Sequence, residues 1–208
     1  MVGIVDYGMG NILSVYNAIE FIGETPVVCK KPEELRDVEK VILPGVGAFG
    51  DCVANLRQKG FAEALEIEVI KNKKPILGIC LGMQVMARKG YEGGEHDGLG
   101  WLNADVVRLD PHNSAFRIPH IGWHEIDYRD DSPLFSGLPE EPDFYFVHSY
   151  YMRCNEQIDV DATFDYGGLF TAAVRKDNIF AVQFHPEKSQ DYGLKVLENF
   201  LNWKPQVC

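Results

Sequence analysis

Short apolar runs alternate with longer amphipathic stretches over the first 90 residues of the chain. Runs rich in β-branched residues predict four buried strands, at 2–7, 26–30, 40–45 and 75–79. Apolar spacing near the helical period, or a proline suited to a first helical turn, predicts helices at 11–22, from Pro32, at 49–72 and at 82–89. Strands that alternate with helices in this way form a mostly parallel sheet with helices on both faces.

The second half of the chain changes character after the glycine-rich segment 92–100. Six extended runs follow without a long helix between them, at 105–109, 122–126, 144–152, 163–167, 169–174 and 179–185. Successive strands of this kind predict antiparallel additions to the edge or face of the sheet. A last helix is expected at 192–203. Because no repeat or linker interrupts the pattern, residues 1–208 are predicted to form one α/β domain of three layers.

Composition narrows the class of protein. The hydrophobic share of 46% and the charged share of 25% are those of an ordinary globular domain. A net charge of −11, with no cluster of Lys and Arg, argues against a nucleic-acid partner. Neither a basic leader nor a run of roughly 18 apolar residues is present, so neither a signal peptide nor a membrane span is expected.

The five cysteines are scattered and include no CxxC pair. An odd number without paired spacing predicts reduced thiols in a cytoplasmic protein, and neither a disulfide framework nor a zinc site. They are Cys29, Cys52, Cys80, Cys154 and Cys208.

One of these cysteines lies in a chemically suggestive setting. The strand at 75–79 runs directly into Gly78-Ile79-Cys80-Leu81-Gly82, after which a helix is expected. This is the pattern of a nucleophile elbow, in which small flanking residues permit a sharp turn that exposes the nucleophile. The alternative is that Cys80 is only a small buried apolar side chain.

A thiol nucleophile needs a base, and the base needs a group that orients it. The last extended run ends at His185, and Glu187 follows two residues later. In extended chain, residues two apart point to the same side, so the Glu187 carboxylate can hold the imidazole. Cys80, His185 and Glu187 are therefore a candidate catalytic triad.

A third element lies one strand before the elbow. Pro44-Gly45-Val46-Gly47 follows the strand at 40–45, and its glycines allow backbone N–H groups to approach a substrate carbonyl. Such groups can stabilise the oxyanion that forms during acyl transfer.

Together these motifs resemble the class I, or triad-type, glutamine amidotransferases. The segments that carry this resemblance are PGVGAFGD (44–51), GICLGMQ (78–84) and FHPEKS (184–189). Three more are similar to a narrower group, the glutaminase subunits of imidazole glycerol phosphate synthase in histidine biosynthesis: DYGMGNILS (6–14), IPHIGWHE (118–125) and FVHSY (146–150). The resemblance spans essentially the whole chain.

The resemblance implies a flavodoxin-like fold and a specific activity. Cys80 would form a thioester with glutamine, His185 would act as base and then acid, and Glu187 would orient His185. No cofactor is implied. Ammonia would pass to a (β/α)8-barrel synthase subunit, the partner in a heterodimer, which makes imidazole glycerol phosphate and AICAR.

Further residues are assigned by the same resemblance. The positions implied to bind L-glutamine are Gly45, Val46, Gly47, Leu81, Gln84, Glu92, Ser149 and Tyr150. The positions implied to face the synthase are Trp123, Tyr145 and Lys188.

One position departs from the family pattern. After Ile-Gly-Trp the family usually has Asn, and this chain has His124. The departure leaves open a second pathway, in which the same glutaminase serves a paralogous synthase that amidates a surface sugar. An inactive regulatory subunit is a third alternative, which the intact Cys80, His185 and Glu187 oppose.

Two other patterns predict neither a metal site nor a nucleotide site. His120 and His124 are four residues apart, but Pro119 and Gly122 argue against a helix and no third ligand is near, so no metal site is predicted. The segment 6–11 lacks both the GxGxxG spacing and a Walker lysine, so no nucleotide site is predicted. The resemblance implies instead that this segment lies near the active site and the partner face.

Overall fold

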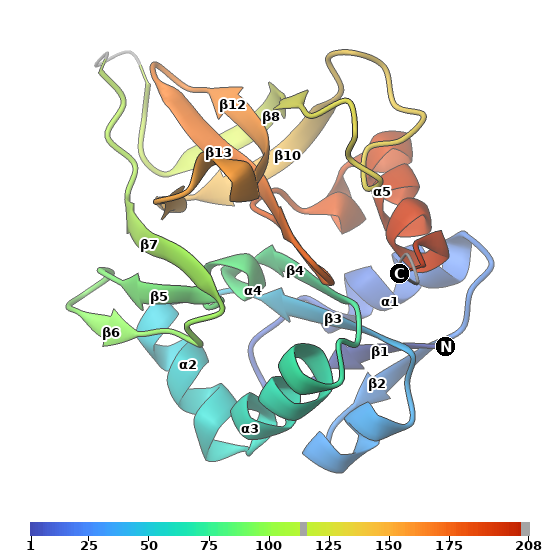
Figure 1. The fold of residues 1–208 in the computed structure, drawn as a ribbon. Helices are drawn as coiled ribbons and strands as arrows, with labels where there is room; N and C mark the ends of the chain where they lie inside the picture. The colour runs from blue at the N-terminus through green and yellow to red at the C-terminus, as the bar shows by residue number, and fades with distance from the viewer. Residues whose placement is uncertain (113–115, 205–208) are drawn as a thin grey trace.

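A computed structural model describes residues 1–112 and 116–204, so Cys208 lies outside the described residues. The chain forms an α/β domain around an eight-stranded mixed sheet, with strand order β2-β1-β3-β4-β14-β13-β12-β9. The predicted three-layer α/β architecture is confirmed (Figure 1).

Five neighbouring strands of this sheet are parallel: β2 (Pro26–Cys29), β1 (Val2–Val5), β3 (Lys40–Gly45), β4 (Ile76–Cys80) and β14 (Ile179–Val182). The first four match the predicted strands; β1, β3 and β4 are buried almost throughout, whereas Val27 of the edge strand β2 is 37% exposed. In the register of these strands, Gly45 pairs with Cys80, and Val182 pairs with Ile79. The carboxyl ends of β3, β4 and β14 are therefore level.

Helices cover both faces of the parallel strands. On one face lie α1 (Ile12–Phe21) and α5 (Gln190–Asn202), drawn in blue and red beside one another in Figure 1. On the other face lie α2 (Phe49–Gln58), α3 (Phe61–Leu65) and the π-helical turn η2 (Glu66–Lys71). Alternate strand residues point to the two layers: Ile42 and Leu77 pack toward α1 and α5, whereas Val41 and Leu43 pack toward α2 and α3.

The second half adds mostly antiparallel strands, as predicted, although β7 pairs with β5 in parallel. At the far edge of the central sheet, β13 (Leu169–Lys176), β12 (Val160–Asp165) and β9 (Asp127–Tyr128) continue from β14. A two-stranded sheet pairs β8 (His120–Glu125) with β10 (Asp143–His148). A four-stranded sheet has the order β11 (Tyr150–Cys154), β7 (Leu102–Arg108), β5 (Ala87–Gly90) and β6 (His96–Asp97).

Three helical predictions need correction. The run at 49–72 is broken because Gly60 adopts a φ of 76°, which ends α2 and starts α3. The segment from Pro32 is a 3-10 helix, η1 (Pro32–Arg36). The helix predicted at 82–89 is wrong: α4 covers only Leu81–Gln84, and β5 follows.

Long-range hydrogen bonds explain the early end of α4. The backbone N–H groups of Leu99, Gly98 and Gly100 donate to the carbonyls of Val85, Arg88 and Ala87 at 2.7, 2.8 and 3.0 Å. Carbonyls that a continuing helix would use internally are thus bonded to a segment that is ten or more residues away in the sequence. The 3-10 turns η3 (Gln157–Asp159) and η4 (Pro186–Lys188) complete the elements.

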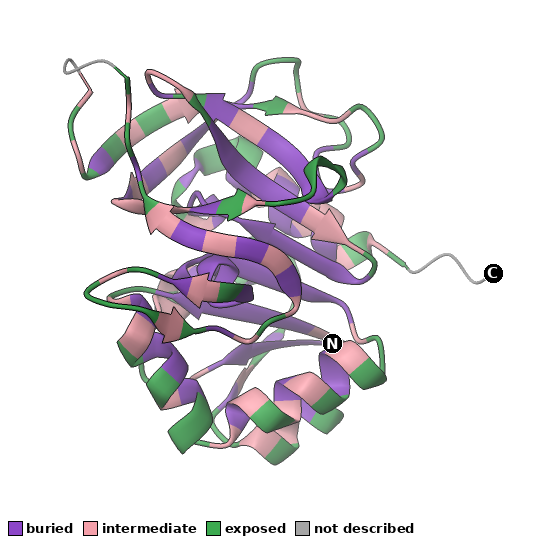
Figure 2. Cartoon of the chain, turned by 60° about the vertical axis from the view of Figure 1, so that its left-hand side comes forward, coloured by how far each residue is buried: buried purple, intermediate pink, exposed green. Residues whose placement is uncertain are grey.

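Figure 2 shows buried residues concentrated along the strands and on the inward sides of the helices. The described thiols Cys29, Cys52, Cys80 and Cys154 are all free. Among the described residues, no helix has the length and apolar character needed to cross a membrane.

Candidate active site

Cys80 lies at a strained strand-to-helix turn. Its backbone has φ 54° and ψ −109°, a conformation that a non-glycine residue rarely adopts, and the residue ends β4 directly before α4. A Cβ at Gly82 would lie 1.8 Å from the Leu43 carbonyl oxygen, so only glycine lets α4 approach β3 this closely. The strain and the close approach are those expected of a nucleophile elbow.

Because β3, β4 and β14 end at the same level, the segments at the ends of β3 and β14 lie beside this turn. The Pro44–Gly47 loop follows β3 on one side of β4, and the segment from Gln183 to Glu187 follows β14 on the other side. Residues that follow neighbouring parallel strands meet at the same edge of the sheet, where open α/β sheets bind their ligands. The fold therefore unites three segments that are separated by up to 140 residues in the sequence.

His185 and Glu187 form the contact that their spacing predicts. His185 Nδ1 lies 2.8 Å from Glu187 Oε1, and both side chains are almost fully buried. The backbone also holds His185, since its N–H donates to the Tyr145 carbonyl at 2.9 Å and its carbonyl accepts from Ser189 Oγ at 2.7 Å. The imidazole is thus fixed in orientation and has its second nitrogen free for Cys80.

The environment favours the protonated form of His185. Burial alone lowers the pKa of the imidazole, but hydrogen bonds and charge interactions with Cys80 and Glu187 outweigh it and raise the pKa to about 10. Raised pKa values with specific charge partners are typical of catalytic groups.

A cavity of about 250 Å³ opens over Cys80 and His185. Seven of the eight predicted glutamine-binding residues line it together with Cys80 and His185: Val46, Gly47, Leu81, Gln84, Glu92, Ser149 and Tyr150. The eighth, Gly45, is buried behind the cavity, where a Cβ would lie 2.7 Å from the Gly82 backbone nitrogen. Gly45 therefore makes room for the elbow and does not line the cavity.

Two predicted ligands of glutamine are themselves anchored by hydrogen bonds. Gln84 Nε2 donates to the Tyr150 carbonyl at 2.8 Å and to Gln183 Oε1 at 3.0 Å. Glu92 Oε2 accepts from the Phe49 N–H at the start of α2, at 2.8 Å. The Glu92 carboxylate is the acidic group of the cavity.

Sequence reasoning missed four residues of the site. Asn11 Nδ2 donates to Glu187 Oε1 at 3.3 Å, Gln183 Nε2 lies 3.7 Å from Cys80 Sγ, and Val147 and His148 line the cavity. A signal existed for Gln183, which lies two residues before His185 and so points to the same side of the chain. Asn11 ends the segment 6–11, which the resemblance places near the active site, but its contact with Glu187 follows only from the fold.

The three residues predicted to face a partner lie together beside the cavity. Tyr145 of β10 pairs with Trp123 of β8, with ring centroids 6.0 Å apart, and Lys188 Nζ lies 5.9 Å from the centre of the Tyr145 ring. The neighbouring cross-strand pair is Val147 and Ile121, of which Ile121 is 60% exposed. On this outer face of the β8–β10 sheet the pairs Trp123–Tyr145 and Ile121–Val147 are apolar and the end pair Glu125–Asp143 is acidic, and Val147 and Lys188 also line the cavity.

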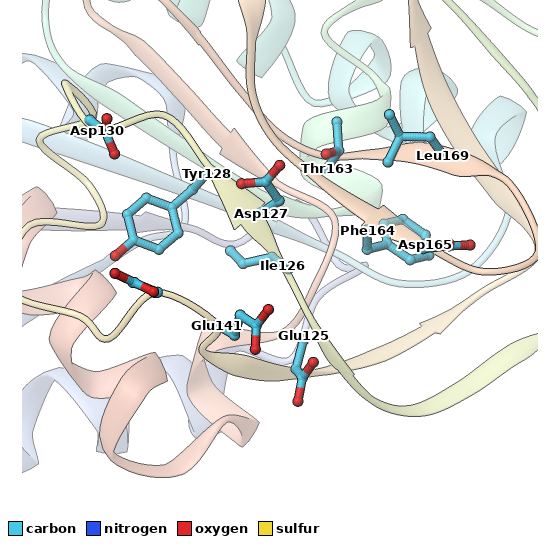
Figure 3. Close-up of a pocket in the computed structure, with 11 residues that line it drawn as sticks. Glu125, Ile126, Asp127, Tyr128, Asp130, Glu141, Thr163, Phe164, Asp165 and Leu169 are labelled. Carbon is cyan, nitrogen blue, oxygen red and sulfur yellow. The ribbon is translucent and has the colours of Figure 1, made fainter.

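A larger cavity, of about 590 Å³, lies elsewhere, at the β9 edge of the central sheet (Figure 3). Its lining is acidic and includes no residue of the triad; the carboxylates are Glu125, Asp127, Asp130, Glu140, Glu141 and Asp165. Within residues 1–112 and 116–204, no group of three or more His, Cys, Asp or Glu side chains is arranged to hold a metal ion.

Comparison with known proteins identifies the family of the chain. The family described as "Glutamine amidotransferase class-I" matches residues 4–203 of the chain. The chain belongs to the class-I glutamine amidotransferase family.

Within that family the chain is similar to subunits of one enzyme. It is 47% identical to "Imidazole glycerol phosphate synthase subunit HisH 1" of Campylobacter jejuni (strain RM1221), over 97% of this chain and 99% of the relative. It is also 47% identical to the HisH subunit of Sulfurimonas denitrificans, over 98% of this chain and 99% of the relative.

Solved structures show the same fold. A crystal structure of a glutamine amidotransferase superposes with a TM-score of 0.74 at 23% identity, covering 96% of this chain and 98% of the other. The structure of PurLQS from Thermotoga maritima gives a TM-score of 0.76 at 22% identity, with 97% of each chain covered.

Proposed function

We propose that this chain is the glutaminase subunit of an imidazole glycerol phosphate synthase, and that Cys80, His185 and Glu187 are its catalytic triad. The observation that carries the proposal is the 2.8 Å contact between Glu187 Oε1 and Nδ1 of His185, which lines one cavity together with Cys80. The similarity to HisH subunits over nearly the full length supports the assignment to histidine biosynthesis. Residues 1–208 act as one glutamine amidotransferase domain.

The first half of the reaction releases ammonia. The Cys80 thiolate attacks the carboxamide carbon of glutamine, and the C–S bond forms as the carbonyl oxygen becomes an oxyanion. The backbone around Gly47 and Leu81 stabilises that oxyanion. Protonated His185 gives its proton to the leaving nitrogen, the C–N bond breaks, and ammonia departs from a glutamyl thioester.

The second half regenerates the enzyme. Neutral His185 takes a proton from water, and the water oxygen attacks the thioester carbon. The C–S bond breaks, glutamate leaves, and Cys80 returns as a thiolate beside protonated His185. Glu187 remains ionised and holds the imidazole in one orientation through both halves.

The cavity suits an α-amino acid substrate. The Glu92 carboxylate is placed to pair with the α-ammonium group of glutamine, while Gln84, Ser149 and Tyr150 provide polar groups along the same wall. The amide end then points toward Cys80.

The ammonia is used by a partner. Free ammonia is largely protonated in neutral water and is then not a nucleophile, so direct transfer to a synthase avoids its loss. We infer that the partner is a (β/α)8-barrel synthase subunit, bound in a heterodimer on the face formed by Trp123, Tyr145 and Lys188. The apolar character of that face and its continuity with the cavity support this choice.

The decisive experiment measures glutamate release from glutamine by the purified chain. It is run alone, with the candidate barrel synthase and its ribonucleotide substrate, and with Cys80→Ala. We expect strong stimulation by the loaded partner and loss of activity in Cys80→Ala, whereas Cys154→Ala, a free cysteine outside the cavity, retains activity. Persistent release by Cys80→Ala would exclude Cys80 as the nucleophile.

The same assay separates the two pathways. A synthase that amidates a surface sugar is the alternative partner, and His124 is the residue that raises it. If only that synthase stimulates glutamate release, the triad chemistry stands and the histidine pathway is wrong.

A further inference from the structure

Three histidines on the inner side of the β8–β10 sheet are bonded in series. His124 Nδ1 lies 3.2 Å from His120 Nε2, and His120 Nδ1 lies 3.3 Å from His148 Nε2. His148 Nδ1 in turn lies 2.8 Å from the Tyr150 carbonyl oxygen. His148 and Tyr150 line the cavity over Cys80, whereas His124 lines a separate cavity at the surface.

The contact between His148 Nδ1 and the Tyr150 carbonyl determines the tautomer of all three rings. A carbonyl oxygen can only accept, so His148 Nδ1 carries hydrogen and its Nε2 carries a lone pair. His120 must then donate from Nδ1 and accept at Nε2, which in turn requires His124 to donate from Nδ1. All three rings are therefore Nδ1–H tautomers, and the order of donors runs from the surface toward the cavity.

The burial of the two inner rings keeps them neutral. His120 and His148 are 1% and 7% exposed. Burial, with the neighbouring histidines, lowers the pKa of His120 to about 3, and burial lowers that of His148 to about 4 despite its bond to Tyr150. Near neutral pH neither ring gains a second N–H that would reverse the order of donors.

The series continues beyond Tyr150 to the sulfur of Cys80. The Tyr150 carbonyl also accepts from Gln84 Nε2, whose second hydrogen goes to Gln183 Oε1. This orientation of the Gln183 amide turns its Nε2 toward Cys80 Sγ, 3.7 Å away. The two glutamine amides thus have their O and N positions determined by the same carbonyl that fixes His148.

We propose that His124, His120 and His148 are positioning residues of the glutamine site, forming a tautomer relay that holds Tyr150, Gln84 and Gln183 in their working orientation. The tautomers of the two inner rings depend on His124, which donates the first hydrogen bond of the series and is the only half-buried ring of the three. Without its donor, the buried His120 Nε2 loses its partner, and the Nε2–H tautomer of His120 becomes accessible. In that tautomer, His120 Nδ1 and His148 Nε2 would point lone pairs at each other. The repulsion is relieved only if the hydrogen of His148 moves to Nε2, and His148 then no longer donates to the Tyr150 carbonyl.

The matched variants are His124→Leu and His124→Asn. Leucine fills the site but donates no hydrogen bond. In asparagine, Nδ2 is attached to Cγ as Nδ1 is in histidine, so it can donate to His120 Nε2. The effect of the donor is thereby separated from the effect of the ring.

The first measurement is the ¹⁵N NMR spectrum of the histidine rings in the folded wild-type chain at neutral pH. We expect His120, His124 and His148 to have protonated Nδ1 and unprotonated Nε2, with mixed tautomers at His120 and His148 in His124→Leu and a single tautomer in His124→Asn. A wild-type His148 that carries its proton on Nε2 would overturn the relay. This readout needs neither a partner nor catalysis.

The second measurement tests the catalytic consequence, which rests on the proposed function. In partner-stimulated glutamate release, His124→Leu should lower kcat/KM for glutamine about five- to ten-fold, mainly through KM, as expected for loss of about one hydrogen bond. His124→Asn should recover most of that loss. Equal kcat/KM in the leucine and asparagine variants would overturn the positioning role. If wild type releases no glutamate while its tautomers are as expected, the proposed function fails and the relay stands.

Discussion

Cys80 and Glu187 both act on the ring of His185. Glu187 Oε1 lies 2.8 Å from His185 Nδ1, and both Cys80 and Glu187 raise the pKa of the ring, which favours the protonated form that can give a proton to a leaving amine. The backbone of Cys80 is strained, and the ring of His185 is tied down by Tyr145 and Ser189. Cys80 and His185 are thus both held in place, and the orientation and pKa of the His185 ring depend on the Glu187 carboxylate.

Replacing that carboxylate should change both rate and pH behaviour. Glu187→Gln removes the charge that stabilises protonated His185, so we expect kcat for glutamate release to fall about 10²- to 10⁴-fold. A pKa raised from an unfolded value of about 6.5 contributes stability that is complete below about pH 6.5 and is lost as pH rises through about 10. Chemical denaturation at several pH values should therefore show a smaller loss of unfolding free energy over that window in Glu187→Gln than in wild type.

The control for this variant is Glu198→Gln on α5, whose partner Lys195 is exposed. It should leave both the rate and the pH dependence of stability unchanged, since exposed ion pairs contribute little. An identical pH dependence in wild type and Glu187→Gln would contradict the role assigned to Glu187.

Among the elements, the junction of η4 and α5 determines where Glu187 lies. A Cβ at Gly193, in the first turn of α5, would lie 1.9 Å from the Pro186 carbonyl oxygen. The helix therefore touches the turn that carries Glu187, and glycine is what permits the contact. Gly82 performs the same task for α4 against β3 on the other side of the site.

We expect Gly193→Ala to displace η4 from α5. Overpacking of this kind costs about 1–3 kcal/mol of unfolding free energy, and the shift of Glu187 should also lower kcat/KM for glutamine. Gly168→Ala is the matched control, since its nearest neighbour, the Phe170 ring, would lie at an ordinary 3.4 Å. Urea unfolding and the glutaminase assay test both variants; equal stabilities would show that η4 and α5 are not in tight contact in solution.

The molecule presents an apolar patch formed by Ile121, Trp123, Tyr145 and Val147 beside the cavity over Cys80. Ile121 and Trp123 project outward from β8, while His120 and His124 project inward from the same strand. A partner on the outer face would thus lie one strand's thickness from the histidine relay. The proposed docking face, the three histidines and the cavity over Cys80 therefore follow one another in the same region of the molecule.

Removal of Trp123 should weaken the heterodimer. Truncation of a central aromatic residue at an interface commonly costs 2 kcal/mol or more, so Trp123→Ala should raise the dissociation constant for the synthase at least about 30-fold. Phe21→Ala, which removes an aromatic side chain that is 79% exposed on α1, should have no effect. Titration calorimetry with the synthase distinguishes them, and equal affinities would place the interface elsewhere.

Much of this architecture was predictable because its signals are local. Apolar runs predicted the parallel strands, and the residues around Cys80 and His185 indicated a triad before any coordinates. The helix predicted at 82–89 failed because its carbonyls find partners beyond residue 97, which no local pattern reveals. Gly60 was likewise read as part of a helix, although its backbone conformation ends one.

The sequence by itself determined the alternation of strands and helices, the elbow at Cys80 and the pairing of His185 with Glu187. These depend on periodicity and on residues no more than a few positions apart. The tertiary structure alone decided that Asn11 reaches Glu187, that Gln183 reaches Cys80, and that His124, His120 and His148 share one line of hydrogen bonds. Those contacts depend on sheet order and register, which follow from the free energy of the whole chain and not from any one segment.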